Sequence, residues 1–196
     1  MDNALNWDHR MEIRKGLDTG TLLLAEPFLP DPYFGRSVVL LCDHDAEEGS
    51  FGFIINQPLP RTLGEITDDI DVPDATVFFG GPVNEQTLHF LHRNDPPIDD
   101  ALHLFGRWYW GGDLRQITAA LEDGRIDPSD IRLFLGYSGW GQGQLRQEII
   151  GNSWILAEMR DEYFDLPPED IWSQALTDMG GIYRTMAHYP ENPSSN

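Results

Sequence analysis

Short apolar segments, each bounded by Gly, Pro or Asp, dominate the first half of the chain. Segments of this length and composition are typical of β-strands. The expected strands are residues 21–25, 37–42, 51–56, 76–79 and 88–92, with a weaker pair at 102–105 and 108–110. Residues 38–41 are apolar at every position, which favours a strand covered on both faces.

Helical patterns enter only in the second half of the chain. The expected helices are residues 113–122, 142–149 and 168–179, and two further strands are expected at 131–135 and 154–157. The last helix has Pro168 at its start and Gly180 just past its end, where these residues are favoured. Strands first and helices gathered later predict an α+β fold with a mixed β-sheet rather than repeated βαβ units.

A chain of 196 residues fits one domain. We expect that domain over residues 16–188, with a flexible N-terminal tail at 1–15 and a disordered C-terminal tail at 189–196. The N-terminus lacks the apolar core of a secretory signal, and no apolar run approaches the roughly 18 residues of a membrane span. With Cys42 as the single cysteine, a cytoplasmic location and no contact with a membrane are the simplest expectations.

The charge balance narrows the possible partners. Thirty-three acidic residues against thirteen Lys and Arg give a net charge of −20. Binding to a polyanion depends on neutralising its phosphates with Lys and Arg, so direct nucleic-acid binding is disfavoured. The same excess of acid predicts a chain that becomes more stable as salt screens its self-repulsion.

Residues 136–145 form the most distinctive segment, with four glycines lying between an expected strand and an expected helix. Glycines at such a junction let the backbone turn sharply or approach a ligand closely. The segment matches the G-x-S-x-G nucleophile elbow only at Gly136 and Ser138, because Trp140 stands in the fifth position. A hydrolase using Ser138 is therefore an alternative, and a tight turn that lets Trp140 pack against the sheet is the favoured interpretation.

Two clusters of metal-ligand residue types fail on spacing. Counted from Asp43, the sixth and twelfth positions of a calcium loop would be Glu48 and Ile54, where Gly and Glu are required. His89 and His92 lie three apart in an expected strand and so point to opposite faces. We expect no metal site and no cofactor, an acidic turn over residues 43–49, and His92 packed at a strand end.

Several short motifs in a fixed order resemble the AlgH (YqgE) family of bacterial proteins over residues 16–179. They lie at residues 20–25, 31–39, 49–58, 80–83, 91–92, 136–140, 144–145, 148, 152–154 and 171–172. The resemblance implies a single α+β domain whose sheet curls into a pseudo-barrel flanked by helices. It also carries the label of a transcriptional regulator, but no catalytic residues. The chain departs from the family pattern at Ser138, where Ala is common, and at Arg146, where an acidic residue is usual.

If several strands end at one edge of the sheet, their polar and glycine residues would form a shared cleft with Trp140. The candidate binding residues are Asn56, Gly80, Gly81, Pro82, Tyr137, Gly139, Trp140, Gln144 and Glu148. The preferred function is a non-catalytic regulatory or adaptor domain that binds a small ligand or a protein partner there. A transcriptional regulator acting on DNA, directly or through a partner, is the alternative, although residues 142–149 contain only Arg146 as a base and so form no basic recognition helix.

Overall fold

The computed structural model describes residues 17–66, 75–93 and 98–190, and the expected N-terminal tail and the last six residues of the expected C-terminal tail lie outside them. The strands are β1 (Thr21–Ala25), β2 (Val38–Asp45), β3 (Gly49–Ile54), β4 (Pro58–Thr62), β5 (Thr76–Phe79), β6 (Val83–Arg93), β7 (Leu102–Phe105), β8 (Trp108–Trp110), β9 (Ile131–Trp140) and β10 (Trp154–Glu158). The helices are α2 (Leu114–Glu122), α3 (Gln144–Ile150), α4 (Pro168–Met179) and α5 (Gly181–Met186), with 3-10 turns at Leu63–Glu65, Pro128–Asp130 and Asp161–Asp165.

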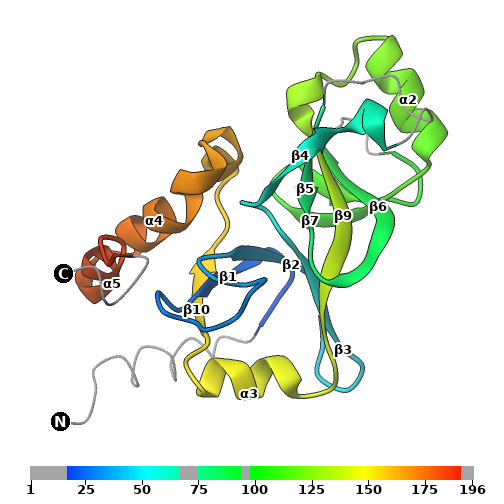
Figure 1. Ribbon diagram of the computed structural model, residues 1–196. Helices are drawn as coiled ribbons and strands as arrows, with labels where there is room; N and C mark the ends of the chain where they lie inside the picture. The colour runs from blue at the N-terminus through cyan, green and yellow to red at the C-terminus, as the bar shows by residue number, and fades with distance from the viewer. Residues whose placement is uncertain (1–16, 67–74, 94–97, 191–196) are drawn as a thin grey trace, which may run out of the picture.

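The strands form one curled sheet in the order β10-β1-β2-β3-β9-β6-β8-β7, with β5 paired to β9 and β4 paired to β5 (Figure 1). The long strand β9 is the centre of the sheet. One side of β9 pairs with β6. Along the other side, the first half of β9 pairs with β5 and its end pairs with β3. The β5–β9 pair is parallel and the other pairs are antiparallel, so the mixed sheet and the α+β class are confirmed. The sheet closes into a half-barrel, as the resemblance implied.

The glycine-rich segment was expected to be a turn between a strand and a helix, and that expectation is wrong. Strand β9 continues through the segment to Trp140 and pairs there with β3, so the turn is confined to residues 141–143. Gly136 has a φ of +69°. Gly80 packs against it, and a Cβ on Gly80 would lie 2.2 Å from the carbonyl oxygen of Gly136. The glycines therefore let β9 bend and let the chain after β5 cross it closely.

Three hydrophobic cores hold the helices on the sheet. Strand β2 alternates between the first two: Val38 and Leu40 face α4 and α5, whereas Val39 and Leu41 face α3. All four side chains are fully buried, which confirms that this strand is covered on both faces. The third core fixes α2 against β5, β6 and β9.

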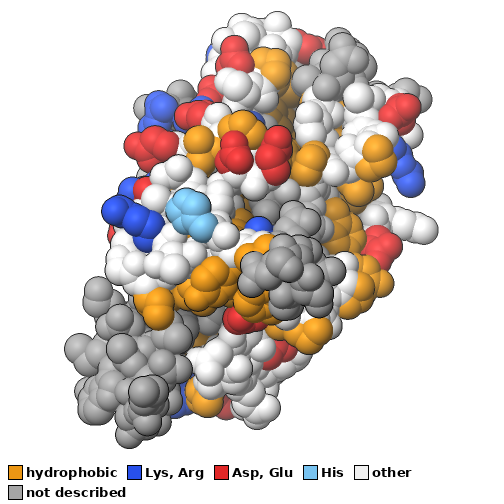
Figure 2. Space-filling view, turned by 60° about the vertical axis from the view of Figure 1, so that its left-hand side comes forward, with side chains coloured by type: hydrophobic (Ala, Val, Ile, Leu, Met, Phe, Trp, Pro, Cys, Tyr) orange, Lys and Arg blue, Asp and Glu red, His pale blue; other side chains and the backbone are white. Residues whose placement is uncertain are grey.

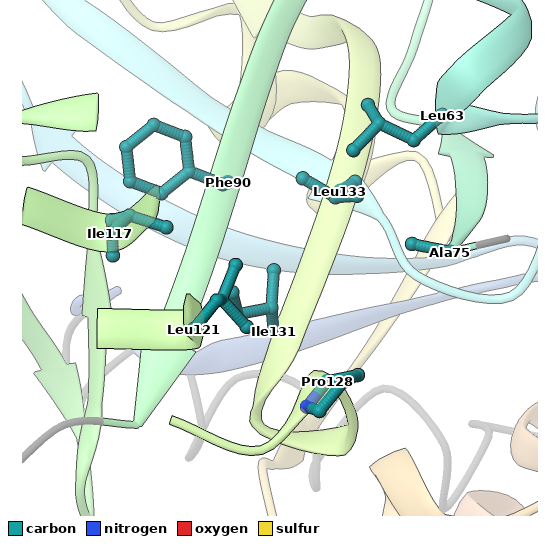
Figure 3. A pocket seen from close by; sticks show the side chains of 8 residues that line it. All are labelled: Leu63, Ala75, Phe90, Ile117, Leu121, Pro128, Ile131 and Leu133. Carbon is teal, nitrogen blue, oxygen red and sulfur yellow. The ribbon is translucent and has the colours of Figure 1, made fainter. Parts of the chain in front are cut away.

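The third core contains a small apolar hollow in which Leu121 of α2 lies beside Ile131 of β9 (Figure 3). Its lining is Leu63, Ala75, Phe90, Ile117, Leu121, Pro128, Ile131 and Leu133. The space holds about 10 Å³, the minimum for a single water, and offers that water only apolar neighbours. The hollow is therefore a packing gap and not a ligand site.

Most expected elements are present, and several are longer than expected. Strand β1 and helix α4 have the expected bounds, whereas β6 begins five residues earlier than 88 and β2 runs on to Asp45. Strand β4 and helix α5 were not expected. No helix in the described part of the chain is long and apolar enough to cross a membrane.

Candidate functional site

The curled sheet leaves a cleft at one end of its concave interior. The cleft has a volume of about 560 Å³. It is lined by Asp43, Asp45, Glu48, Gly49, Ser50, Phe51, Val83, His89, Trp110, Tyr137, Gly139 and Trp140. We call it the aromatic cleft. Its volume lies within the roughly 300–1,000 Å³ of sites that hold small molecules.

Strand register places Asp43, Phe51, Tyr137 and Gly139 of the lining on one face of the sheet. Asp43 of β2 is paired with Phe51 of β3, and Phe51 is paired with Gly139 of β9. Tyr137 lies two residues before Gly139 and therefore on the same face. A Cβ on Gly139 would lie 3.1 Å from the Tyr137 ring, so the missing side chain leaves open the space beside that ring.

Four rings form the wall of the aromatic cleft. Phe51 lies at the centre, with its ring centroid 4.7 Å from that of Trp110 and 6.0 Å from that of Tyr137. The imidazole of His89 lies 5.9 Å from Tyr137 and 6.4 Å from Trp110. These rings lie at the edge of the first core, and its buried residue Phe53 packs against His89 at 5.2 Å. The wall is therefore a packed aromatic surface backed by the rigid core.

His89 presents an unsatisfied polar atom at this wall. Its Nε2 is buried and has no hydrogen-bond partner among the described residues. Burial lowers the pKa of His89, so the imidazole is neutral at pH 7. Buried polar atoms are nearly always paired in folded proteins, so this nitrogen is an exception within the wall.

The acidic β2–β3 hairpin also lines the cleft, next to Phe51. The Asp45 side chain accepts hydrogen bonds from the backbone N–H groups of Glu48 and Glu47, at 2.9 and 2.7 Å. These bonds lower the pKa of Asp45, which keeps its carboxylate ionised. The expected acidic turn between two strands is confirmed here, and the carboxylates of Asp43 and Glu48 line the cleft with that of Asp45.

The predicted site residues divide into three groups. Tyr137, Gly139 and Trp140 line the aromatic cleft. The Trp140 side chain, however, belongs to the second core on the opposite face of the sheet, where its indole N–H donates to Glu148 Oε2 at 2.8 Å. Trp154 donates to the same oxygen at 2.8 Å.

Glu148 and Gln144 form the second group. Gln144 Nε2 donates to Glu148 Oε1 at 2.9 Å, while its own Oε1 accepts from the backbone N–H of Gly141 at 3.1 Å. These bonds connect α3 to the end of β9 and, through Trp154, to β10. The cluster of Gln144, Glu148, Trp140 and Trp154 therefore attaches α3 to the sheet.

The third group lies where chain segments cross. Asn56 accepts a hydrogen bond from the Val38 N–H at 2.8 Å and donates to the Arg36 carbonyl at 3.0 Å, so its side chain binds the backbone before and within β2. Gly80 accepts from Ile54 N–H at 2.9 Å, and Gly81 and Pro82 follow it directly before β6. None of these four residues lines the aromatic cleft.

Ser138, the alternative nucleophile, is fully buried. Its hydroxyl donates to the Gly80 carbonyl at 3.1 Å. The geometry gives the hydroxyl a structural partner and no exposed position from which to attack a substrate. His92 is also buried, with its Nε2 3.1 Å from the Gly111 carbonyl, as expected for a histidine packed near a strand end.

Sequence reasoning missed the residues that make the wall and the acidic side of the cleft, among them Phe51, His89 and Trp110. Two signals pointed to the region: the aromatic run 108–110 and the acidic run 43–49. Neither showed that the two runs meet across β3 and β9. A separate groove of about 750 Å³ lies between β1, β10 and helices α4 and α5, near Tyr163 and Asp178. Among the described residues no group of three or more His, Cys, Asp or Glu side chains is placed to hold a metal ion.

Comparison with protein families gives one match that spans most of the chain. The family model described as AlgH-like (DUF179) matches residues 22–184. A "UPF0301 protein" from Cytophaga hutchinsonii is 39% identical over 182 residues, covering 92% of this chain and 100% of that protein. One from Chlorobium limicola is 41% identical over 181 residues, covering 92% and 96%.

Two solved structures share the fold. The crystal structure of a protein from Corynebacterium diphtheriae superposes with a TM-score of 0.72 at 22% identity, covering 88% of this chain and 93% of that one. The solution structure of the AlgH protein from Pseudomonas aeruginosa superposes with a TM-score of 0.67 at 26% identity, covering 87% and 93%. Both similarities extend over nearly the whole chain.

Proposed function

The chain belongs to the AlgH-like family, and we propose that this member is a non-catalytic binding domain whose aromatic cleft holds a small ligand. One observation carries the proposal: the cleft of about 560 Å³ joins an aromatic wall, which includes the imidazole of His89, to acidic side chains of the β2–β3 hairpin. Apolar walls with a few well-placed polar groups are typical of sites for small molecules. Protein partners would then respond to the liganded state, which is the regulatory or adaptor role.

Two nucleophilic side chains, Ser138 and Cys42, are buried, whereas Ser50 lines the aromatic cleft with its Oγ 2.7 Å from His44 Nδ1. Ser138 is buried and donates to a backbone carbonyl, and Cys42 is buried with its pKa raised well above the usual value, mainly by desolvation. A thiol of that kind stays protonated and unreactive at pH 7. Neither group therefore lies in the cleft in a form that could attack a substrate.

Direct action on DNA fits the surface less well. Acidic side chains are spread over the face seen in Figure 2. Together with the net charge of −20, this pattern opposes contact with phosphates. A regulatory effect on transcription would then pass through a partner protein.

Native mass spectrometry tests the proposal. The protein is purified gently from its own host, and its native and denatured masses are compared. We expect additional mass in the native state that disappears on denaturation, because a small ligand held without a covalent bond is released when the cleft unfolds. A wild-type protein that carries no additional mass would contradict a retained ligand.

Two matched variants locate the ligand. Tyr137→Ala removes one ring of the cleft wall, whereas Tyr33→Ala removes a tyrosine that stacks on Phe79 outside it, at 6.0 Å between ring centroids. The additional mass is expected to be lost from Tyr137→Ala and kept by Tyr33→Ala. The same mass in both variants would place the ligand elsewhere.

A further inference from the structure

We infer that the ligand of the aromatic cleft is a small organic cation, an ammonium or guanidinium group attached to an apolar body. The inference rests on the proposed function, because it specifies what the same cleft binds. It follows from how charge and aromatic surface are distributed around the cleft. The acidic side chains come from the β2–β3 hairpin, and the rings come from β3, β6, β8 and β9.

The charged side chains of the cleft have one sign. Asp43, Asp45 and Glu48 line it, and no Lys or Arg does. Asp43 and Asp45 lie two residues apart in β2, so their side chains share one face of the strand, the face that carries Phe51. Opposite charges a few ångströms apart attract measurably even near a protein surface, whereas an anion brought to the same place would be repelled.

The aromatic wall favours the same ligand. The faces of Trp, Tyr and Phe rings are electron-rich and attract a cation within about 6 Å, and groups of such rings are known to bind ammonium groups. The ring centroids of Trp110 and Tyr137 lie 4.7 and 6.0 Å from that of the central ring, Phe51. Their apolar surface would also bury the body of the ligand.

His89 completes the wall without opposing a cation. Burial lowers the pKa of its imidazole, so at pH 7 it brings no positive charge. The charge of the whole chain acts in the same direction, because a net charge of −20 concentrates cations near the surface and the low-dielectric walls of a cleft focus that field. The acidic side chains that line the cleft and the net charge of the whole chain therefore both favour a cationic ligand.

Isothermal titration calorimetry with three probes of similar size tests the inference. The probes are phenethylamine (a cation), 2-phenylethanol (neutral) and 3-phenylpropionate (an anion), each titrated into the full chain at pH 7. We expect phenethylamine to bind at least about tenfold more tightly than 2-phenylethanol, and 3-phenylpropionate to bind most weakly. Affinity for the amine should also fall as salt is added.

Charge-removing variants show whether the acidic hairpin is responsible. Asp43→Asn with Asp45→Asn removes two charges, and Asn at position 45 keeps a side-chain oxygen for the two backbone N–H groups of the turn. The matched control, Glu122→Gln with Glu169→Gln, removes two exposed charges on α2 and α4. Circular dichroism confirms that each variant folds. The preference for the amine should disappear in the first pair and persist in the second.

The outcomes distinguish a preference for cations from the presence of a ligand site in the cleft. Absence of phenethylamine binding, or equal binding of all three probes, overturns the cation inference. If the probes bind equally and Tyr137→Ala still weakens them, the cleft remains a ligand site and only its charge preference is wrong. Binding of phenethylamine that neither Tyr137→Ala nor the Asp43/Asp45 pair weakens places the amine outside the cleft and overturns the inference as well.

Discussion

Replacement of Glu148 by alanine is expected to destabilise the fold strongly, although the residue looked like a ligand-binding group in the sequence. Glu148 Oε2 accepts the indole N–H groups of Trp140 and Trp154, each at 2.8 Å. The two tryptophans are only 6% and 1% exposed, so their N–H groups have little access to water. Glu148→Ala would leave both donors without a partner.

The magnitude follows from these two bonds. A buried donor left unsatisfied costs about 1–3 kcal/mol, so two give about 2–6 kcal/mol. Glu148 itself is half-buried, and water entering its place would satisfy part of the loss. We therefore expect Glu148→Ala to lower the free energy of unfolding by about 2–4 kcal/mol. Glu148→Gln keeps one oxygen that can accept both indoles, and should cost about 1 kcal/mol.

Urea unfolding followed by far-UV circular dichroism measures these differences, since the signal does not depend on the tryptophans whose environment changes. Gln147→Ala is the matched control, because Gln147 is exposed on the same helix and its change to alanine alters helix propensity in a similar way. If the free energies of unfolding of Glu148→Ala and Gln147→Ala differ by less than about 0.5 kcal/mol, the cluster does not hold α3 on the sheet. That result would contradict a structural role for Glu148.

Three further predictions concern the fold. Gly81→Ala should cost about 3 kcal/mol or more in urea unfolding, because φ is +146° and a Cβ would lie 2.4 Å from Ser138 N; a fully stable variant would contradict this close approach. Burial lowers the pKa of His92 in the folded chain. As the pH falls through the unfolded-state pKa of about 6.5, the unfolded chain therefore binds more protons than the folded chain, and the free energy of unfolding decreases. His92→Gln should lose less stability than wild type between pH 7.5 and pH 5, and an equal loss would show that His92 is not responsible. The thermal midpoint should rise as sodium chloride is added, because screening relieves the repulsion of 33 acidic residues; a midpoint that stays constant or falls would show that this repulsion does not limit stability.

Sequence reasoning succeeded where a local pattern decides the structure. Helix α4 has Pro168 at its start, Gly180 after its end and apolar residues at helical spacing between them, so local signals and tertiary packing agree. The two-faced burial of β2 was likewise evident from its uninterrupted apolar residues. In both cases the neighbours in the sequence carry enough information.

Reasoning from the sequence failed where strand pairing overrides local preference. Residues 136–139 contain two glycines and a serine, which are weak strand formers, yet pairing with β3 and β6 extends β9 through them. The exposed start of β6 near Asn84 is polar and has no alternating pattern that would mark it as a strand. These residues are strands because of partners far away in the chain.

The aromatic cleft could not be assembled from the sequence for the same reason. Phe51, His89, Trp110 and Tyr137 come from four different strands, and the order of those strands in the sheet decides that they meet. Tyr137 and Gly139, which stood out in the sequence because the glycine-rich segment was unusual in itself, line this cleft. Gln144 and Glu148 belonged to the same segment but serve the packing of α3.

The most direct test of the central claim is a ¹H–¹⁵N correlation spectrum of the full chain, recorded with and without a mixture of small aromatic and aliphatic fragments. A ligand site in the aromatic cleft predicts that the largest shift changes occur at the amides of Phe51, His89 and Tyr137 and at the Trp110 indole. Shift changes concentrated around Tyr163 and Asp178, in the larger groove beside α4 and α5, would contradict it.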